Sequence, residues 1–143
     1  MTAVREQIFA AIETRLQAIA GVGEVERMPA GDPARFPALH LFDNGDRPET
    51  GEAGTHRFVL AVGIDGYVQG GDGSAAHGEA NDLYAAVIEV LFPEPVLDSL
   101  ASEIEIEGLQ MLVAERASAR RVAFSLDLSI HYATRRGSPQ IID

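Results

Sequence analysis

Four histidines are the side chains best suited to metal binding or acid–base chemistry in this chain, which has no cysteine. Metal-ligating histidines on a helix commonly stand four residues apart, and no pair here has that spacing. His40 and His131 could meet across a sheet, a point that the sequence alone leaves open. We therefore predict that the chain binds no metal and that the histidines lie on sheet faces or at the surface: His40, His56, His77 and His131.

Two short motifs could bind an ion or a phosphate, but both lack a required residue. Asp43–Asp46 (DNGD) is similar to the start of a calcium-binding loop, yet the glycine and the bidentate glutamate that such a loop needs further on are missing. Gly70–Ser74 (GGDGS) precedes a predicted helix, where backbone amides can bind phosphate. The chain has no lysine, so the P-loop pattern is absent. We expect two turns, the first with exposed carboxylates.

Ser74 and His77 could in principle act as nucleophile and base. They stand three residues apart at the predicted start of a helix, where a serine commonly caps the first backbone amides. The sequence contains no nucleophile-elbow motif. We therefore predict a helix cap here, no catalytic residue and no cofactor.

Charged residues gather at the ends of the last two predicted strands. Three glutamates alternate with Ile104 and Ile106 and so lie on one face, and five arginines stand near the two ends of the last strand. We predict that both groups contact a neighbouring subunit or partner protein and not DNA; the alternative is a solvated strand end. The residues are Glu103, Glu105, Glu107, Arg116, Arg120, Arg121, Arg135 and Arg136.

The composition is that of a globular protein with a strong negative charge. The chain has 143 residues, which fits one domain, and 46% of them are hydrophobic. The formal net charge of −11 argues against a groove that grips nucleic acid, because phosphate binding needs clustered cations. The charge can serve general solubility, or it can form an acidic wall past which DNA slides without sticking.

The sequence predicts no contact with a membrane. It contains no apolar run of about 18 residues, the length of a transmembrane helix. The N-terminal segment (MTAVREQIF) lacks the basic and apolar regions of a secretory signal. We expect a cytosolic protein.

A strand over Arg121–Tyr132 has the clearest pattern in the chain. Apolar residues alternate without exception with small or polar ones, which is typical of a half-buried strand. The eleven alternating residues, 122–132, at about 3.3 Å each span roughly 36 Å, about the width of a compact domain of this length. Such a strand either crosses the whole domain or reaches a neighbour. Its apolar face consists of Val122, Phe124, Leu126, Leu128, Ile130 and Tyr132.

The other elements follow from apolar periodicity and from glycine and proline stops. We predict helices over residues 2–20 and 75–92, the first capped by Thr2 and ended at Gly21, and one helical turn over 96–100. Further strands are expected over 24–28, 38–43, 56–69 and 102–117. The strand over 56–69 belongs in the centre of the sheet because both its faces are partly apolar. A change of phase at Gly108 predicts a bulge.

These elements predict an α+β fold. Short connections favour a mainly antiparallel sheet of about five strands, with the two helices packed on one face. The helix stripes that contain Ile8, Ile12, Leu83 and Val87 are expected to cover the apolar face of the last strand. Residues 1–143 form a single predicted domain, with a mobile loop over 44–55 and a loose C-terminal tail from about residue 135.

The arrangement resembles that of the tail terminator proteins of long-tailed bacteriophages and related gene transfer particles. The resemblance covers about residues 3–134 and rests on the order and spacing of segments, with no signature residue. The segments are VREQIFAAIETRLQAI, PALHLFD, FVLAVGIDGYV, NDLYAAVIEVLF, PVLDSL and a final pair of long strands that ends in HYAT.

The resemblance implies a structural virion protein and not an enzyme. Tail terminators form a ring, most often of six subunits, that caps the finished tail tube and stops its polymerisation. The ring provides the joining surface to the head connector, and DNA passes through it without specific binding. The implied partners are copies of the chain itself, the tail tube protein and a head connector or neck protein. The implied location is the virion tail, assembled in the cytoplasm of the host bacterium, with no cofactor.

Two other functions stay open at this point. A different neck or tail-completion protein of the same particle would share the architecture. A small α+β enzyme or ligand-binding protein would instead need a pocket lined by converging polar groups. The oligomeric state distinguishes these alternatives best, because a ring favours the two particle proteins and a monomer with a deep, closed pocket favours the enzyme or ligand-binding protein.

Overall fold

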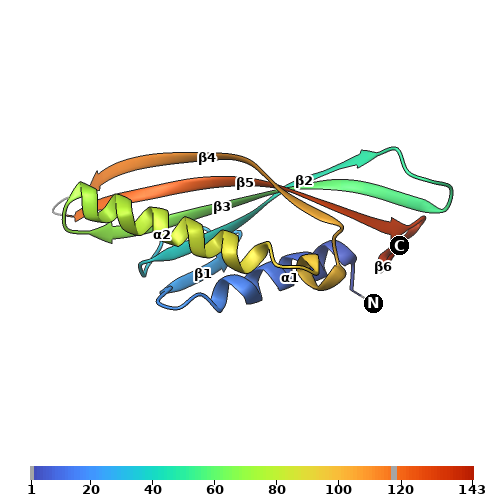
Figure 1. Ribbon diagram of the computed structural model, residues 1–143, viewed down its shortest axis with the longest axis horizontal. Helices are drawn as coiled ribbons and strands as arrows, with labels where there is room; N and C mark the ends of the chain where they lie inside the picture. The colour runs from blue at the N-terminus through green and yellow to red at the C-terminus, as the bar shows by residue number, and fades with distance from the viewer. Residues whose placement is uncertain (1, 117–118) are drawn as a thin grey trace.

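The computed structural model describes residues 2–116 and 119–143, with the side chains of residues 114–116, 119 and 120 outside the description. Two helices lie on one face of a long, curled sheet (Figure 1), so the predicted α+β fold is confirmed. The elements are α1 (Val4–Gln17), β1 (Glu24–Arg27), β2 (Ala38–Glu49), β3 (Thr55–Gly70), α2 (Gly73–Leu91), the 3₁₀ turn η1 (Val96–Ser99), β4 (Glu103–Arg116), β5 (Ala119–Arg135) and β6 (Ser138–Ile142).

The sheet has the strand order β1-β2-β3-β5-β4. All neighbouring strands are antiparallel except β1 and β2, which are parallel. As predicted, β3 is central, between β2 and β5. It pairs with β5 from Thr55 opposite Arg135 to Gly70 opposite Arg120, and so occupies one whole edge of β5. Both β4 and β6 therefore pair along the other edge of β5.

Strand β5 is longer than its alternating segment predicts. Its 17 residues at about 3.3 Å each extend roughly 55 Å, which exceeds the width expected of a compact domain of this length. Figure 1 shows β3 and β5 running along the whole molecule. They end beside the start of α2 on one side and extend past the helical layer on the other, where the β2–β3 turn and β6 lie. The register between β4 and β5 shifts between Ile106 and Gly108, so the predicted bulge at Gly108 is confirmed.

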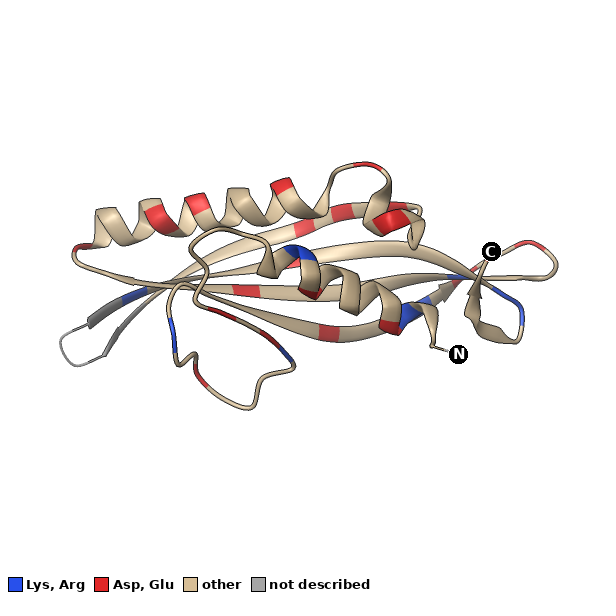
Figure 2. Cartoon of the chain, turned by 90° about the horizontal axis from the view of Figure 1, so that it is seen from below, with Lys and Arg blue, Asp and Glu red and all other residues tan. Residues whose placement is uncertain are grey.

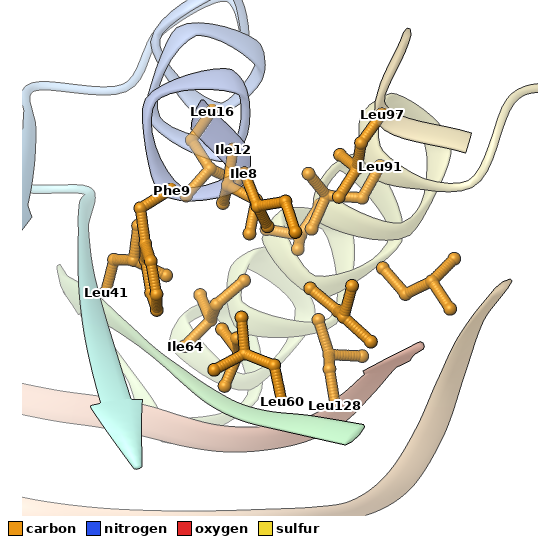
Figure 3. Packing of buried hydrophobic residues seen from close by; sticks show 14 of the residues in the cluster. Ile8, Phe9, Ile12, Leu16, Leu41, Leu60, Ile64, Leu91, Leu97 and Leu128 are labelled. Atoms are coloured by element: carbon orange, nitrogen blue, oxygen red, sulfur yellow. The ribbon is translucent and has the colours of Figure 1, made fainter. Parts of the chain in front are cut away.

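The core lies between the helices and one face of the sheet (Figure 3). The predicted stripes of α1 and α2 face the sheet there, and Ile8, Ile12 and Val87 are fully buried. Leu97 in η1 closes the same core with a fully buried side chain. Neither described helix is long and apolar enough to cross a membrane.

The apolar face of β5 is buried as predicted, but it serves two clusters. Phe124 and the residues after it join the main core, whereas Val122 packs with Val68 in a smaller cluster beneath the first turns of α2. Phe124 lies directly opposite Gly66 of β3. A Cβ at Gly66 would overlap the Phe124 ring, so the glycine makes room for this aromatic side chain.

Two segments predicted to be irregular are strands, which corrects the loop over 44–55 and the loose tail from 135. Strand β2 continues to Glu49 through a bulge between Asp43 and Asp46, so only a short turn joins it to β3. The C-terminal residues form β6, which folds back on β5. Both segments are polar, and backbone pairing with the long central strands stabilises them in place of apolar burial.

The predicted helix caps were wrong. Helix α2 begins after Asp72, whose carboxylate accepts a 2.8 Å hydrogen bond from the Ala75 N–H, so Ser74 is not the cap. Helix α1 begins after Ala3, and no side chain caps it. An aspartate caps a helix as well as a serine does, and the sequence GDGS offered both.

Replacing Phe124 with alanine should destabilise the fold by about 3–5 kcal/mol, because the change removes a buried ring and leaves a cavity. Urea denaturation at equilibrium measures the loss. A matched control is Leu112→Ala in β4, where the side chain is 58% exposed and the expected loss is below about 1 kcal/mol. Equal losses for the two variants would contradict the assigned core.

Candidate functional site

The three glutamates of β4 lie beside polar residues of β5. Glu103 is paired opposite His131 and Glu105 opposite Ser129, so their side chains share the sheet face that the helices leave open. Glu105 Oε1 is 2.7 Å from His131 Nε2, and the Ser129 hydroxyl donates a 2.8 Å hydrogen bond to Glu107. All three glutamates are exposed. The structure therefore brings them together, while their predicted role in an interface stays a prediction.

The histidines His40 and His131 belong to separate clusters and do not meet across the sheet. His40 is buried, and its Nε2 is 2.7 Å from a Glu24 carboxylate oxygen. Together with Glu26 they place three possible ligand atoms close together, and Glu103, Glu105 and His131 do the same on the same face, towards the β4 edge of the sheet. In each cluster the histidine already bonds to a carboxylate. The expectation that the chain holds no metal stays a prediction.

The DNGD motif forms part of an ion-pair network that sequence analysis missed. Asp43 accepts a hydrogen bond from the Gly45 N–H, and its other contact is the Arg5 guanidinium of α1, at 2.9 Å. Arg5 also bonds to Asp46 at 3.1 Å, and the Tyr132 hydroxyl donates to the same Asp46 carboxylate at 2.6 Å. The carboxylates that suggested a calcium loop thus join α1 to β2 and β5.

The network shifts the pKa values of its members. Burial alone would raise the pKa of Asp43, but the hydrogen bonds from Arg5 and from the Gly45 N–H lower it below its ordinary value. Burial, aided by the hydrogen bond to Asp46, raises the pKa of Tyr132. Elsewhere, the hydrogen bond to His40 lowers the pKa of Glu24. The folded state therefore favours ionised carboxylates.

The segment Gly70–Ser74 offers no anion site. Asp72 places its carboxylate at the N-terminal amides of α2, where a phosphate would have to bind. His77 is exposed on α2. No hydrogen bond links His77 to Ser74 in the described part of the chain, so the structure shows no nucleophile and base here.

The predicted arginine group divides into different environments. The guanidinium of Arg121 lies over the Phe36 ring, 4.9 Å from its centroid, and the buried Nε atom has no hydrogen-bond partner among the described residues. Arg121 therefore holds the loop between β1 and β2 against the open face of the sheet. The side chains of Arg116 and Arg120 lie outside the described residues.

Arg135 and Arg136 are exposed at the opposite end of the sheet and form no ion pair within the described residues. Hydrogen bonds join the segments around these two arginines. The Arg136 N–H donates to the Gly54 carbonyl at 2.8 Å, and the Thr55 hydroxyl bonds to the Asp143 side chain. The β2–β3 turn and the C-terminal strand thus form one end of the molecule together, with unpaired arginines on it.

Large exposed hydrophobic side chains concentrate on one edge of the sheet. Six such side chains occur in the described part of the chain, and five of them lie on β4 or β6, along the edge of β5 that faces away from β3. Helix α2 packs over β3 and β5, and most of β4 lies beyond it, although Ile104 reaches the core. The five residues are Ile106, Leu109, Leu112, Val113 and Ile142, and their exposure was not predicted.

Charge is unevenly distributed along the molecule. Figure 2 shows acidic residues along α2 and the strands, with arginines mainly towards the ends and on α1. The α1 arginines Arg5 and Arg15 have internal partners, as does Arg27 of β1. The cations without such partners therefore lie mostly at the ends and edges of the sheet, where other chains could reach them.

The fold and these features describe a long α+β sheet protein with charged and apolar edges. The chain is similar to a solved structure described as the "Virion of native gene transfer agent (GTA) particle". The TM-score is 0.59 at 16% sequence identity, over 92% of this chain and 99% of that chain. The likeness shows a shared fold along nearly the whole length of both chains. No protein-family model matches the chain, and neither does any curated protein.

Arg121→Ala should destabilise the fold by about 1–2 kcal/mol, because it removes the guanidinium from the Phe36 ring and the packing of its alkyl stem. The matched variant Arg136→Ala removes an exposed arginine without an ion pair and should change stability by less than about 0.5 kcal/mol. Urea denaturation compares the two. A loss for Arg136→Ala as large as that for Arg121→Ala would contradict the assignment.

The fold should also lose stability in acid. A carboxylate whose pKa is lowered by folding stabilises the folded state above its unfolded pKa, near 4 for aspartate, and this contribution disappears as pH falls through the folded value. Asp43 and Glu24 are such groups. Urea midpoints measured from pH 6 to pH 3 should therefore fall, and less so in Arg5→Met, where Asp43 has lost its partner. An identical fall in both proteins would show that the Arg5 network does not contribute.

Proposed function

We propose that this chain is a structural protein of a phage-like or gene transfer particle, and specifically its tail terminator. Six copies form a ring that caps the tail tube and stops its growth. The ring offers a joining surface to the head connector, and DNA passes through it. In this function no residue is catalytic and no cofactor is needed.

The observation that carries the proposal is the full-length likeness to a chain of a gene transfer agent virion, which covers 99% of that chain. A short motif can recur in unrelated proteins, but here the likeness covers 92% of this chain and 99% of the other. The order and spacing of the segments that resemble tail terminators support the proposal as well. These two lines of support are independent of any single residue.

The shape and surface of the chain support work between other proteins. Strands β3 and β5 extend past the helical layer at the end that holds the β2–β3 turn and β6, which gives each subunit one long arm. Unpaired arginines such as Arg135 and Arg136 lie at one end, and exposed glutamates of β4 lie along an edge. Such groups set the register and the rate of encounter between partners when they meet at the rim of an interface.

The negative charge fits a ring through which DNA moves. The net charge is −11, and much of the acid lies on exposed surfaces of α2 and the sheet. A pore wall lined by carboxylates repels phosphate and does not hold it. The proposal therefore includes no DNA-binding site.

Cryo-electron microscopy of particles from cells that express the chain tests the proposal. We expect a single ring of six copies at the head-proximal end of the tail tube, and tubes of uncontrolled length when the gene is removed. Density for this chain in the capsid shell, in the connector or nowhere in the particle would contradict it. A ring placed in the neck, with tube length unchanged on removal, would favour the alternative neck protein.

Charge reversal of Arg135 and Arg136 to glutamate should reduce incorporation into tails without unfolding the subunit. The physical reason is that these arginines have no internal ion pair to lose. The control is Arg57→Glu, since Arg57 lies at the same end but pairs internally with Glu52. Salt-dependent binding of duplex DNA by the unaltered protein, lost on reversal with incorporation unchanged, would show that the arginines hold phosphates instead.

A further inference from the structure

The edge formed by β4 and β6 is built as an open docking surface. Strand β4 has 14 residues and pairs only with β5, so its outer row of backbone N–H and C=O groups has no strand partner in the described part of the chain. A long exposed edge of this kind is a template for pairing with another strand, and natural proteins usually block such edges. Here the bulge near Gly108 is the only interruption in the described register.

The exposed apolar side chains lie along this edge and make it unfavourable to leave uncovered. Val113 is 70% exposed, Leu112 58% and Ile106 45%, and Ile142 continues the row on β6 at 45%. Single exposed apolar residues are common, but a contiguous group marks an interaction site. Covering this strip would remove apolar area from both faces of the sheet at once.

The opposite edge of the sheet is open as well. Strand β1 pairs with β2 only as far as Arg27 opposite Leu41, so β2 has no strand beyond it from Phe42 to Glu49. At the end of β1 stands Met28, the remaining exposed large hydrophobic residue of the described chain, at 56%. Its sulfur is the acceptor for the Asp43 N–H at 3.2 Å, which is a weak partner for a backbone amide.

The charged residues of the two edges lie at the same height along the strand direction, as the pairing across the sheet shows. Glu103 is paired with His131, His131 with Val59, and Val59 with Arg47, so the acidic end of β4 is level with Arg47 on the same face. Arg47 is exposed and has no ion pair among the described residues.

The apolar residues of the two edges also lie at the same height along the strand direction. Leu109 is paired with Leu126, Leu126 with Ile64, and Ile64 with Leu41, whose carbonyl accepts from the Met28 N–H. Two copies set edge to edge thus place opposite charges together and apolar residues together. The facing strands, β4 and β2, run in opposite directions, so they can pair in the antiparallel way that most neighbours in this sheet do.

We propose that the β4–β6 edge docks a second copy of this chain, which presents its β1 edge and the outer half of its β2. The inference rests on the proposed function in so far as a ring requires identical subunits to meet through two different surfaces. To the proposed function it adds which two surfaces of the subunit meet and which residues face each other there. Because each copy carries a charge of −11, the contact depends on the apolar strip and on the local Glu103–Arg47 pairing to overcome repulsion.

Single-cysteine variants test the pairing, because the chain has no cysteine of its own. Glu103→Cys and Arg47→Cys proteins are mixed at the concentration at which the protein assembles and treated with a short bis-maleimide. We expect mixed dimers in high yield and few dimers from either variant alone. The matched control replaces Arg47→Cys with Ala85→Cys, an exposed position on α2 away from both edges, and should give no more than background.

A pair of charge insertions gives a second readout by native mass spectrometry. Val113→Arg should raise the concentration needed for assembly at least about tenfold, because it places a charge in an apolar contact. Ala85→Arg adds the same charge elsewhere and should leave assembly unchanged. Urea denaturation confirms that both variants fold.

The outcomes separate this inference from the proposed function. Dimers from Glu103→Cys alone would show two β4 edges meeting around a two-fold axis and would overturn the pairing with the opposite edge. Assembled rings without mixed cross-links would overturn the docking surface while leaving the tail-terminator proposal intact. A protein that stays monomeric and unlinked at millimolar concentration would overturn the inference, whereas the place of the chain in the particle is decided by microscopy.

Discussion

The pairing of β3 with β5 is the interaction on which the rest of the structure depends. It runs without a register shift from Thr55 opposite Arg135 to Gly70 opposite Arg120. Each strand is longer than a domain of this size is wide, so the pair extends beyond any core that two helices can cover. Its outer parts depend mainly on backbone hydrogen bonds, together with local packing such as the Val68–Val122 cluster and the stacked Phe58 and Tyr132 rings. Polar sequence at the ends is therefore compatible with strand structure.

The same constraint explains which surfaces remain open. The helices cover the middle strands, where Phe124 and its neighbours fill the core. In β4, Ile104 reaches this core, but much of the strand lies outside it. A long, apolar and uncovered edge can pair with another chain in an assembly, whereas in an isolated subunit it favours aggregation. The ion pairs of Arg5 with Asp43 and Asp46 keep α1 fixed to the sheet. Each subunit can therefore present its edges as one rigid unit.

The apolar periodicity of the sequence predicted the elements that are stabilised by burial, and it missed the strands that are stabilised by pairing. The alternation in β5, the stripes of both helices and the bulge at Gly108 were read correctly because apolar residues must face the core. The outer half of β2 is polar and β6 is a short segment with two isoleucines at its end, so no alternating pattern marks either strand. Pairing with neighbouring strands stabilises both. Arg5 and Asp46 are 41 positions apart, so their contact could not be foreseen. Val113 is paired with Val122 beneath the first turns of α2, and its exposure depends on how far that helix covers the sheet, which is likewise a tertiary property.

Amide hydrogen exchange on β4 and on the outer half of β2, compared between dilute and assembled protein, is the most direct measurement of the central claim that copies join edge to edge. The account predicts that outward amides of Leu109–Val113 exchange rapidly in the free subunit and become strongly protected on assembly, together with those of Phe42–Glu49. Protection confined to other segments, with both edges exchanging as fast as before, would contradict it.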